Sequence, residues 1–413
     1  MSYIRLEKDA DGTVELIFDQ EGKAVNVMGE EYAEAMPRAL DELEAMGDAL
    51  KGVYIRSGKP GQFFAGGDIT MMLEMDLNPS AEERESMFCG IIESKAPLAR
   101  LEKLGVPVAV GINGAALGGG YEIALACHHR IALDSPRVKI GLPEAMLGLM
   151  PGAGGVVRMV RMLGMQEALT LISQGKQLVA SRALEAGLVH ELAADEQDMA
   201  KKAKAWLLAN PDAKQPWEAP GYSIPGGGPE DESTQGLTYF GPVNVMNQTK
   251  GNMTAPQVII AAVIDTARVD YDTAHIVEAR YFQRLLLDQV SRNMMTTFFV
   301  QMNQLDAGAS RPEGIDKTDV RKLGILGAGV MGAGIAFTAA KVGIEVVLKD
   351  INQENADKGK AYAATACEKN RRIDERQAAE ILARIHPTAD VNDLAGCDLV
   401  IEAVFENREV KAT

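Results

Sequence analysis

The sequence predicts an α/β protein with more than one domain, and three observations lead to this expectation. The chain has 413 residues, and domains typically contain roughly 100 to 200 residues. Near the start, a strand-like, a helical and a second strand-like segment follow one another at residues 13–18, 30–46 and 52–56. Near the end, residues 322–336 run from a strand through a GxGxxG sequence into a helix of small residues. Strands that alternate with helices indicate a parallel sheet covered by helices.

The composition excludes several classes of protein. Hydrophobic residues make up 46% and charged residues 24%, which is ordinary for a globular chain and unlike a disordered or fibrous one. There are 42 Lys and Arg against 58 Asp and Glu, which gives a net charge of −16. Because no basic stripe is present, we do not expect a nucleic acid partner. The longest apolar run, residues 258–264, is far shorter than the about 20 residues of a membrane span, so we expect none.

The cysteines, histidines and first residues give no sign of a metal or of export. The cysteines are far apart, form no CxxC pair and no dense framework, and therefore indicate a reducing compartment without structural zinc; they are Cys89, Cys127, Cys367 and Cys397. No histidine has metal-ligand spacing with a neighbour. The first ten residues contain acids and no apolar run, so they resemble neither a secretory signal nor a mitochondrial presequence. We expect a cytoplasmic protein with no metal.

The first part of the chain reads as one α/β unit over residues 1–190. Residues 13–18 alternate, with Val14, Leu16 and Phe18 on one face, as expected for a half-buried strand. Residues 106–112 and 130–132 are further apolar runs that each follow a helical stretch. We expect them to be buried strands.

The middle of the chain, residues 191–310, reads as a helical extension and linker. Residues 211–256 hold seven prolines and three consecutive glycines, which favour a long loop or connector. Residues 258–302 contain no Pro or Gly, and their apolar positions recur every three to four residues. This spacing predicts two long helices. Residues 307–319 then read as a second hinge before the last part, residues 320–413.

A glycine-rich turn near residue 327 predicts a Rossmann domain that binds NAD. Gly327 permits the tight turn, Gly329 lets the backbone approach a pyrophosphate, and Gly332 allows the helix to pack closely. The next strand ends at Asp350, about 20 residues after the glycines, where an acid can bind the ribose 2′-hydroxyl and would repel the 2′-phosphate of NADP. The remaining candidates for this site are Val330 and Met331 in the turn and Glu406 after a strand expected at residues 399–404.

A second group of motifs in the first part pairs glycines with carboxylates. Gly119 stands at the start of a helix that carries Glu122 in its first turn, and Gly67 lies in a similar loop. Backbone N–H groups at such places can donate to a developing oxyanion, so two loops could share one thioester oxygen. Glu144 follows a third strand-like segment. Either glutamate taken alone is also typical of a surface acid or a helix-dipole partner.

Together these residues carry a resemblance to known families. Residues 64–69, 112–122, 141–144 and 151–155, in this order, resemble the enoyl-CoA hydratase/isomerase (crotonase) family. The segment from 322 to 350, with residues 398–407, resembles the start of the NAD-binding domain of 3-hydroxyacyl-CoA dehydrogenases. Their fusion resembles the multifunctional α subunits of fatty acid β-oxidation complexes.

The resemblance implies a fold, a reaction and a set of site residues. It implies a ClpP/crotonase spiral fold, an oxyanion hole made by the N–H groups of Gly67 and Gly119, and acid/base roles for Glu122 and Glu144. The reaction would be the reversible hydration of trans-2-enoyl-CoA, with a coenzyme A thioester as substrate. We expect Glu122 to take the proton from water and Glu144 to protonate the α carbon; the reverse stays open, because both could hold the same water. Many relatives have Ala where this chain has Gly67, and the backbone donor is unaffected.

Two other functions and several partners remain open at this point. One alternative is a 3-enoyl-CoA isomerase, which needs only one carboxylate; the other is a noncatalytic module that docks acyl-CoA or a thiolase. The resemblance also implies an oligomer with a thiolase partner. The dehydrogenase's catalytic His and Glu would lie beyond Thr413. We therefore expect a chain truncated at its C-terminus, whose full-length parent is also an NAD-dependent 3-hydroxyacyl-CoA dehydrogenase.

Overall fold

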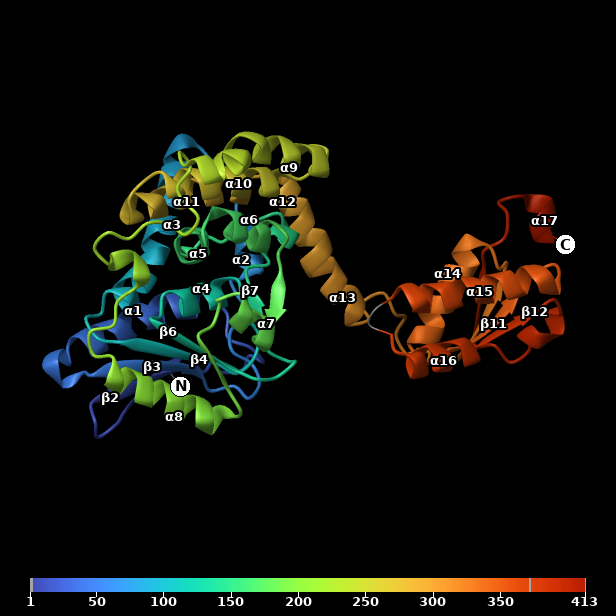
Figure 1. Ribbon diagram of the computed structural model, residues 1–413, viewed down its shortest axis with the longest axis horizontal. Helices are drawn as coiled ribbons and strands as arrows, with labels where there is room; N and C mark the ends of the chain where they lie inside the picture. Colours follow the sequence, from blue (N-terminus) through green and yellow to red (C-terminus); the bar gives the residue numbers. More distant parts are fainter. Residues whose placement is uncertain (1–2, 371–372, 413) are drawn as a thin grey trace. The chain divides into compact units, whose positions relative to one another are not determined.

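The structure is a computed structural model that describes residues 3–370 and 373–412. It divides into two compact units, Met1–Ser310 (unit 1) and Arg311–Thr413 (unit 2), whose helices and strands are labelled in Figure 1. No helix in the described part of the chain is long and apolar enough to cross a membrane.

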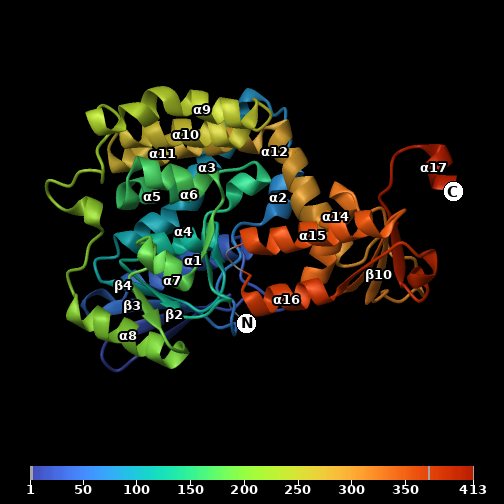
Figure 2. The ribbon, with the colours of Figure 1, turned by 45° about the vertical axis from the view of Figure 1, so that its right-hand side comes forward.

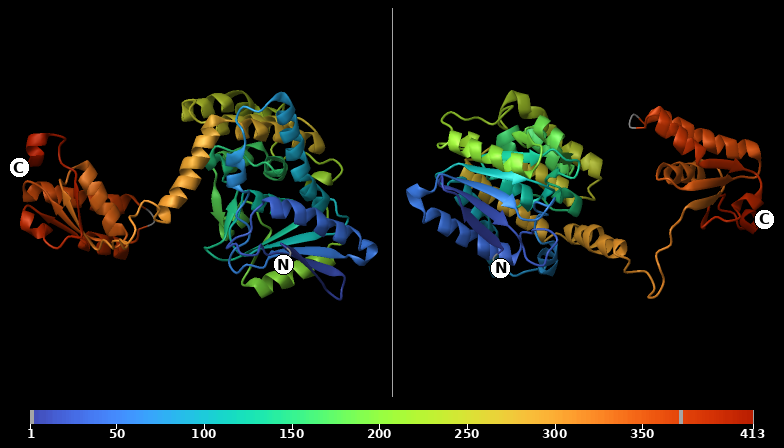
Figure 3. Two further views of the ribbon diagram at one scale, coloured as in Figure 1. Left: turned by 180° about the vertical axis from the view of Figure 1, so that it is seen from behind. Right: turned by 90° about the horizontal axis from the view of Figure 1, so that it is seen from below.

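Unit 1 is built on a six-stranded sheet with the order β1-β2-β3-β4-β6-β9. β1 and β2 pair antiparallel, and every other pair of neighbouring strands is parallel. The strands are β1 (Ile4–Lys8), β2 (Thr13–Phe18), β3 (Gly52–Ser57), β4 (Val108–Ile112), β6 (His129–Leu133) and β9 (Glu191–Ala193). Four of them confirm the sequence prediction. The prediction missed two strands. One is β1, which forms an edge of the sheet among the blue strands of Figure 3 and has mostly polar, partly exposed residues, and the other is the three-residue β9 at the opposite edge.

Helices cover both faces of this sheet. Along β4, Val108 and Val110 enter the large core, whereas Ala109 between them packs in a separate cluster with Met199 and Leu207 of α8 (Glu196–Ala209). The opposite face packs against a group of helices (Figure 1): α1 (Glu30–Glu44), α3 (Ala81–Glu102) and α4 (Gly119–Leu125). Because β9 and α8 complete this layer, the sheet extends past the domain boundary expected at residue 190.

A small second sheet, with the order β5-β7-β8, holds the loops of interest. Its strands are β5 (Ala116–Leu117), β7 (Lys139–Gly141) and β8 (Gln177–Val179). β5 leads directly into α4, and β7 ends just before Glu144. Phe64, from the loop that follows β3, forms a bridge with Ala116 of β5. The small sheet therefore brings three separate loops to one place.

The helical extension packs onto the first part of the chain and shares its core. α9 lies over α10 and α11, which lie over α5 and α6 (Figure 2). The remaining α-helices of unit 1 are α2 (Ile69–Glu74), α5 (Gly155–Leu163), α6 (Met165–Ser173) and α7 (Ala180–Glu185) in its first part, and α9 (Gly241–Thr249), α10 (Thr254–Ala267), α11 (Tyr271–Leu286), α12 (Gln289–Met294) and α13 (Met302–Asp306) in the extension, where a π-helical segment (Met295–Gln301) joins α12 to α13.

Two predictions for the extension were wrong in detail. The expected loop at 211–256 contains the helix α9. The expected pair of long helices over 258–302 is interrupted twice, because the side chains of Asp270 and Asp288 accept hydrogen bonds from backbone N–H groups and begin new helices.

Unit 2 contains a four-stranded parallel sheet with the order β12-β11-β10-β13. The strands are β10 (Lys322–Leu326), β11 (Glu345–Lys349), β12 (Ile385–Thr388) and β13 (Leu399–Glu402), and the helices are α14 (Val330–Lys341), α15 (Gln353–Lys369), α16 (Glu375–Ala383) and α17 (Arg408–Ala412). Strands β10, β11 and β13 confirm the prediction. β12 was missed because it contains Pro387 and His386 and so lacks an apolar run. The strand that follows β11 in the chain is therefore β12, not β13.

Candidate active site

The loop that carries Gly67 is fixed by hydrogen bonds on both sides. The N–H of Met28 donates to the carbonyl of Gly66 at 2.8 Å, and the N–H of Phe64 donates to the carbonyl of Ala115 at 2.9 Å. Gly66 has φ of +97°, a conformation that glycine adopts without strain. These hydrogen bonds are made by residues near Gly67, and the N–H of Gly67 itself takes no part in them.

The second loop turns sharply into α4 and places Gly119 at the first position of that helix. Gly118 has φ of +55°, and its N–H donates to the carbonyl of Gly141 at 3.0 Å. A Cβ atom on Gly120 would lie 2.5 Å from the carbonyl oxygen of Phe64. Only a residue without a side chain lets α4 approach the first loop this closely.

The two candidate oxyanion donors lie side by side. A Cβ atom on Gly119 would be 3.6 Å from the backbone nitrogen of Gly67. Gly119 is in the first turn of a helix, where N–H groups have no intrahelical acceptor. Within residues 3–370 and 373–412, neither N–H donates to a protein acceptor. Two unpaired donors in one place can stabilise a negative oxygen on a bound molecule.

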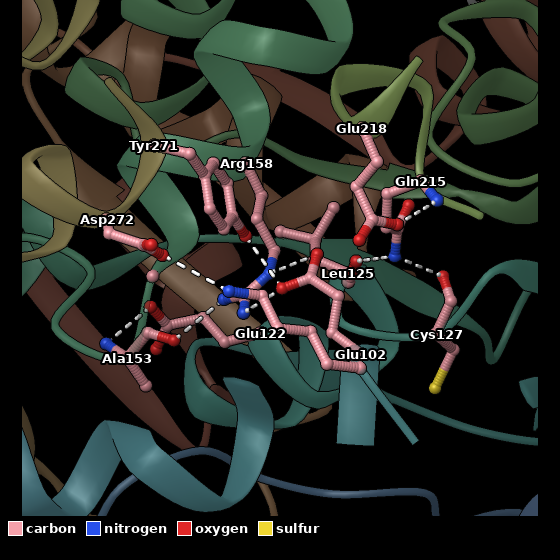
Figure 4. Close-up of polar contacts among 12 residues, drawn as sticks. Glu102, Glu122, Leu125, Cys127, Ala153, Arg158, Gln215, Glu218, Tyr271 and Asp272 are labelled. Atoms are coloured by element: carbon pink, nitrogen blue, oxygen red, sulfur yellow. Dashed lines mark hydrogen bonds and ion pairs between the residues drawn. The ribbon is translucent and has the colours of Figure 1, made fainter. Parts of the chain in front are cut away.

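Glu122 is buried on α4 and is held by the segment that follows Pro151 (Figure 4). Its Oε1 accepts hydrogen bonds from the N–H groups of Ala153 and Gly155, both at 2.7 Å. Burial, followed by the nearby charge of Glu278, raises the pKa of Glu122 to about 7, although the two amide hydrogen bonds oppose the rise. The carboxyl group is thus able to gain or lose a proton near neutral pH.

Glu144 begins the short turn after β7 and presents a carboxyl group to the same place. A Cβ atom on Gly118 would lie 3.0 Å from its Oε1. Its Oε2 is buried and has no hydrogen-bond partner in the described part of the chain. Burial, followed by the charge of Glu122, raises the pKa of Glu144 well above its usual value. Two carboxyl groups with raised pKa values therefore adjoin the pair of amide donors.

This arrangement suits chemistry at a carbonyl compound. The amide donors can polarise a carbonyl oxygen, and the carboxyl groups can move protons beside it. The structure brings together Gly67, Gly119, Glu122 and Glu144, which the sequence reasoning placed in one site. Within the described residues, no cluster of three or more His, Cys, Asp or Glu side chains could hold a metal ion.

Sequence reasoning missed a buried ion pair behind this site. The carboxylate of Glu278, on α11, lies 2.7 Å from the Nζ of Lys95 on α3. Glu278 also accepts hydrogen bonds from the N–H groups of Gly154, Val156 and Val157. No local signal marks a single Glu in a 16-residue helix as buried.

In unit 2 the glycine turn and Asp350 also lie together. Gly327 has φ of +97°, and a Cβ atom on Gly332 would lie 1.8 Å from the carbonyl oxygen of Gly327. Space is open beside Gly329, where a Cβ atom would meet nothing within 4 Å. The Oδ2 of Asp350 accepts a hydrogen bond from the N–H of Ala328 at 2.7 Å. The turn and the acid therefore have the shape that a dinucleotide site requires.

The other three nucleotide candidates differ in their surroundings. Val330 and Met331 open α14 and are 81% and 74% exposed. Glu406 follows β13, at the same sheet edge as the glycine turn, and forms an ion pair with Lys411 at 2.8 Å. Burial alone would raise the pKa of Asp350, but hydrogen bonds from two backbone amides and one side-chain amide, together with a nearby lysine charge, outweigh burial and lower the pKa below its usual range. Asp350 is therefore an anion at neutral pH.

Comparison with known proteins assigns each unit to a family. Residues 10–213 match the enoyl-CoA hydratase/isomerase family, and residues 322–413 match the NAD-binding domain of 3-hydroxyacyl-CoA dehydrogenases. The chain is 33% identical over 419 aligned positions to the fatty acid oxidation complex subunit alpha of Idiomarina loihiensis, covering 98% of this chain and 56% of that protein. The chain thus spans little more than half the length of this relative.

A solved structure shows the same fold in unit 1. The human mitochondrial delta3-delta2-enoyl-CoA isomerase matches with a TM-score of 0.51 and 19% identity, covering 73% of this chain and 99% of that one. At this identity the likeness shows the fold, and it confirms the predicted crotonase architecture.

The raised pKa of Glu122 predicts a change of stability with pH. Because the folded-state pKa of about 7 exceeds the usual 4.5, the folded protein binds more protons than the unfolded chain between these values, and its stability falls as pH rises through 7. Glu122→Gln keeps an acceptor oxygen but carries no charge. We expect its free energy of unfolding to exceed that of the wild type by about 2–3 kcal/mol at pH 8 and to match it near pH 4.5.

Urea unfolding followed by tryptophan fluorescence would measure this difference, because Trp206 and Trp217, the two tryptophans, both lie in unit 1. Glu42→Gln, on the exposed side of α1, is the control and should leave the pH dependence unchanged. If the free energy of unfolding changed with pH in the same way for the wild type and for Glu122→Gln, this result would contradict the raised pKa of Glu122.

Proposed function

The chain belongs to the family that joins an enoyl-CoA hydratase/isomerase domain to a 3-hydroxyacyl-CoA dehydrogenase NAD-binding domain, and we propose that unit 1 hydrates trans-2-enoyl-CoA reversibly in fatty acid β-oxidation. One observation carries the proposal: two unpaired amide donors and two buried carboxyl groups with raised pKa values share one place. A module that only binds acyl-CoA needs the donors but not the paired carboxyl groups.

The amide donors act on the thioester. The N–H groups of Gly67 and Gly119 hydrogen-bond the thioester oxygen and withdraw electrons from the conjugated double bond. When water adds to the β carbon, negative charge develops on this oxygen as an enolate, and the fixed donors stabilise it without reorganising. Removal of one such donor typically costs 10²- to 10³-fold in rate.

The carboxyl groups move the two protons. Both described hydrogen bonds of Glu122 go to Oε1, which leaves Oε2 available to take a proton from water. The unpaired Oε2 of Glu144 can deliver a proton to the α carbon, since a carboxyl group with a raised pKa still holds its proton near neutral pH. In the reverse direction the two groups exchange roles.

The second candidate activity is isomerisation of 3-enoyl-CoA to 2-enoyl-CoA. It requires one carboxylate that removes a proton from the α carbon and returns it to the γ carbon. The unpaired oxygen of Glu144 favours this candidate, because isomerisation can proceed on Glu144 without Glu122.

Unit 2 supports a second proposal, that it binds NAD as part of an NAD-dependent 3-hydroxyacyl-CoA dehydrogenase. The open space at Gly329 fits a pyrophosphate, and the ionised Asp350 fits a ribose 2′-hydroxyl. Val330, Met331 and Glu406 would border the nucleotide. Bound NAD accepts a hydride from a 3-hydroxyacyl group; the residues of this chain contribute binding and orientation.

Substitutions of Glu122 and of Glu144 should have different effects on hydration and isomerisation. With purified chain and crotonyl-CoA, loss of the conjugated double bond measures hydration. Glu122→Gln should lower hydration by about 10³-fold and retain isomerisation of a 3-enoyl-CoA, whereas Glu144→Gln should remove both. Glu42→Gln is the control and should behave as the wild type. Equal and small effects of the two active-site substitutions would refute the roles, and an inactive wild type would refute the hydratase.

Nucleotide binding should depend on Asp350. Calorimetric titration should show NAD binding at least about tenfold more tightly than NADP, because the carboxylate repels a 2′-phosphate. Asp350→Asn should weaken the binding of NAD by about tenfold or more, because this is the usual contribution of one hydrogen bond to a charged group. Asp357→Asn, on the exposed side of α15, is the matched control. Equal affinity for both dinucleotides would contradict this role of Asp350.

We also infer that this protein works in the cytoplasm and assembles with a thiolase into an oligomer. The support is its relationship to a bacterial protein named as a subunit of a fatty acid oxidation complex. A thiolase would cleave the 3-ketoacyl-CoA that the dehydrogenase step produces. Size-exclusion chromatography of the native protein, with and without the thiolase of the same organism, should show a shift to larger size, and unchanged elution would count against the complex.

A further inference from the structure

The segment at residues 153–157 is shared between two buried carboxylates from distant parts of the chain. The N–H groups of residues 153 and 155 donate to Glu122, and those of 154, 156 and 157 donate to Glu278 at 2.8, 2.9 and 3.1 Å. Five successive amides therefore bind two side chains. Because the two sets alternate along the backbone, the segment cannot shift for one carboxylate without shifting for the other.

Glu278 reaches this segment from the helical extension. It is fully buried on α11 and lies 124 residues after Gly154 in the chain. Helix N-termini are usually capped by a nearby Ser, Thr, Asp or Asn, whereas the residue before α5 is Gly154, with φ of +101°. A Cβ atom there would lie 2.0 Å from the guanidinium of Arg158. The segment therefore depends on a distant acceptor.

The charge of Glu278 is balanced by one lysine. Lys95 is buried, lies 2.7 Å from Oε1 of Glu278, and also donates to the carbonyl of His275 at 3.0 Å. The charges of Glu278 and Lys95 act on Glu122 in opposite directions: Glu278 raises its pKa and Lys95 lowers it. A buried pair of this kind costs desolvation energy and is weak evidence for stability alone.

The other charged groups around this cluster do not replace the lysine. Arg158 is paired with Glu102 at 3.0 Å. Burial, and after it the charge of Arg158, lower the pKa of His275 to about 2, so this imidazole is neutral. Glu144 adds a further carboxyl group to the same site.

We propose that Glu278, paired with Lys95, is a positioning residue for the reaction. It fixes the 153–157 segment in the place that Glu122 requires, and its negative charge lies near Glu122. This inference rests on the proposed hydratase function. It gives the helical extension a part in the active site, because α11 supplies the carboxylate that completes the support of a group on α4.

Substitutions of Glu278 and of Lys95 should shift the pH dependence of kcat/KM in opposite directions. Hydration requires ionised Glu122, so kcat/KM rises with pH through its pKa. Glu278→Gln removes a negative neighbour and leaves Lys95, so the rise should move to lower pH. Lys95→Met removes the positive neighbour and leaves Glu278, so the rise should move to higher pH. A role limited to folding would produce no such opposite shifts.

Steady-state kinetics with crotonyl-CoA over a pH series tests the proposal. Glu278→Gln should lower kcat by about tenfold or more with KM within about twofold, because misplacement of a catalytic group acts on the chemical step. Lys95→Arg, which keeps the charge, should restore the profile that Lys95→Met loses. Tyr281→Phe removes a hydrogen bond to Asp265 inside the extension and should leave the profile unchanged. Shifts in the same direction, or no shift in either variant, would overturn the proposal.

A readout without turnover separates this inference from the hydratase assignment. The infrared band of a protonated carboxyl group that is absent in Glu122→Gln reports the titration of Glu122 directly. Its midpoint should fall in Glu278→Gln and rise in Lys95→Met. These shifts in a chain that does not hydrate crotonyl-CoA would refute the hydratase, and with it the role in hydration, but would show that Glu278 and Lys95 set the protonation of Glu122. An active wild type with unshifted midpoints would refute the positioning role alone.

Discussion

The rest of unit 1 depends on the binding of two buried carboxylates by one short run of backbone amides. Burial of a charged carboxyl group is costly unless hydrogen bonds replace its water. Residues 153–157 supply five N–H groups to Glu122 and Glu278, at the positive end of a helix. The backbone must approach both side chains closely, and a Cβ atom on Gly155 would already lie 2.8 Å from Oε1 of Glu122. Gly155 thus follows from the carboxylate that the segment must hold, whereas Gly154 leaves room for the guanidinium of Arg158.

The same constraint extends to the oxyanion loops. Preorganised donors stabilise developing charge only if they stay fixed while the substrate reacts. Here the loop around Gly67 is hydrogen-bonded to Met28 on one side and to the small sheet on the other. α4 carries Gly119 at its first position and Glu122 one turn later. One short helix therefore positions both a candidate oxyanion donor and one of the two carboxyl groups of the proposed reaction.

Sequence alone predicted the parts of this structure that have local signals. Alternating apolar residues located β2 and β3, and the glycine turn followed by Asp350 located the start of unit 2. The candidate site residues of unit 1 could be proposed from the sequence because glycines and acids stand at the ends of predicted strands, and their roles stay a prediction. β12 was missed because Pro387 breaks its pattern. The helices over 258–302 were predicted, but their two interruptions were not, because each depends on a single capping Asp. Glu278 was missed for a different reason: its partners lie 121 to 183 residues away, and no local pattern distinguishes it from a surface glutamate.

In both units a backbone N–H donates a hydrogen bond to a carboxylate, but the pKa of the carboxyl group shifts in opposite directions. Asp350 accepts amide hydrogen bonds at a partly exposed turn, and these bonds together with a nearby lysine charge outweigh burial, so its pKa falls. Glu122 accepts two amide bonds of the same length, but it is buried beside a second negative charge, so its pKa rises. A permanent anion suits a residue that binds a neutral hydroxyl group, and a carboxyl group poised near neutral pH suits one that exchanges protons with water. The depth of burial, more than the hydrogen bonds, therefore separates the proposed binding acid from the proposed catalytic acid.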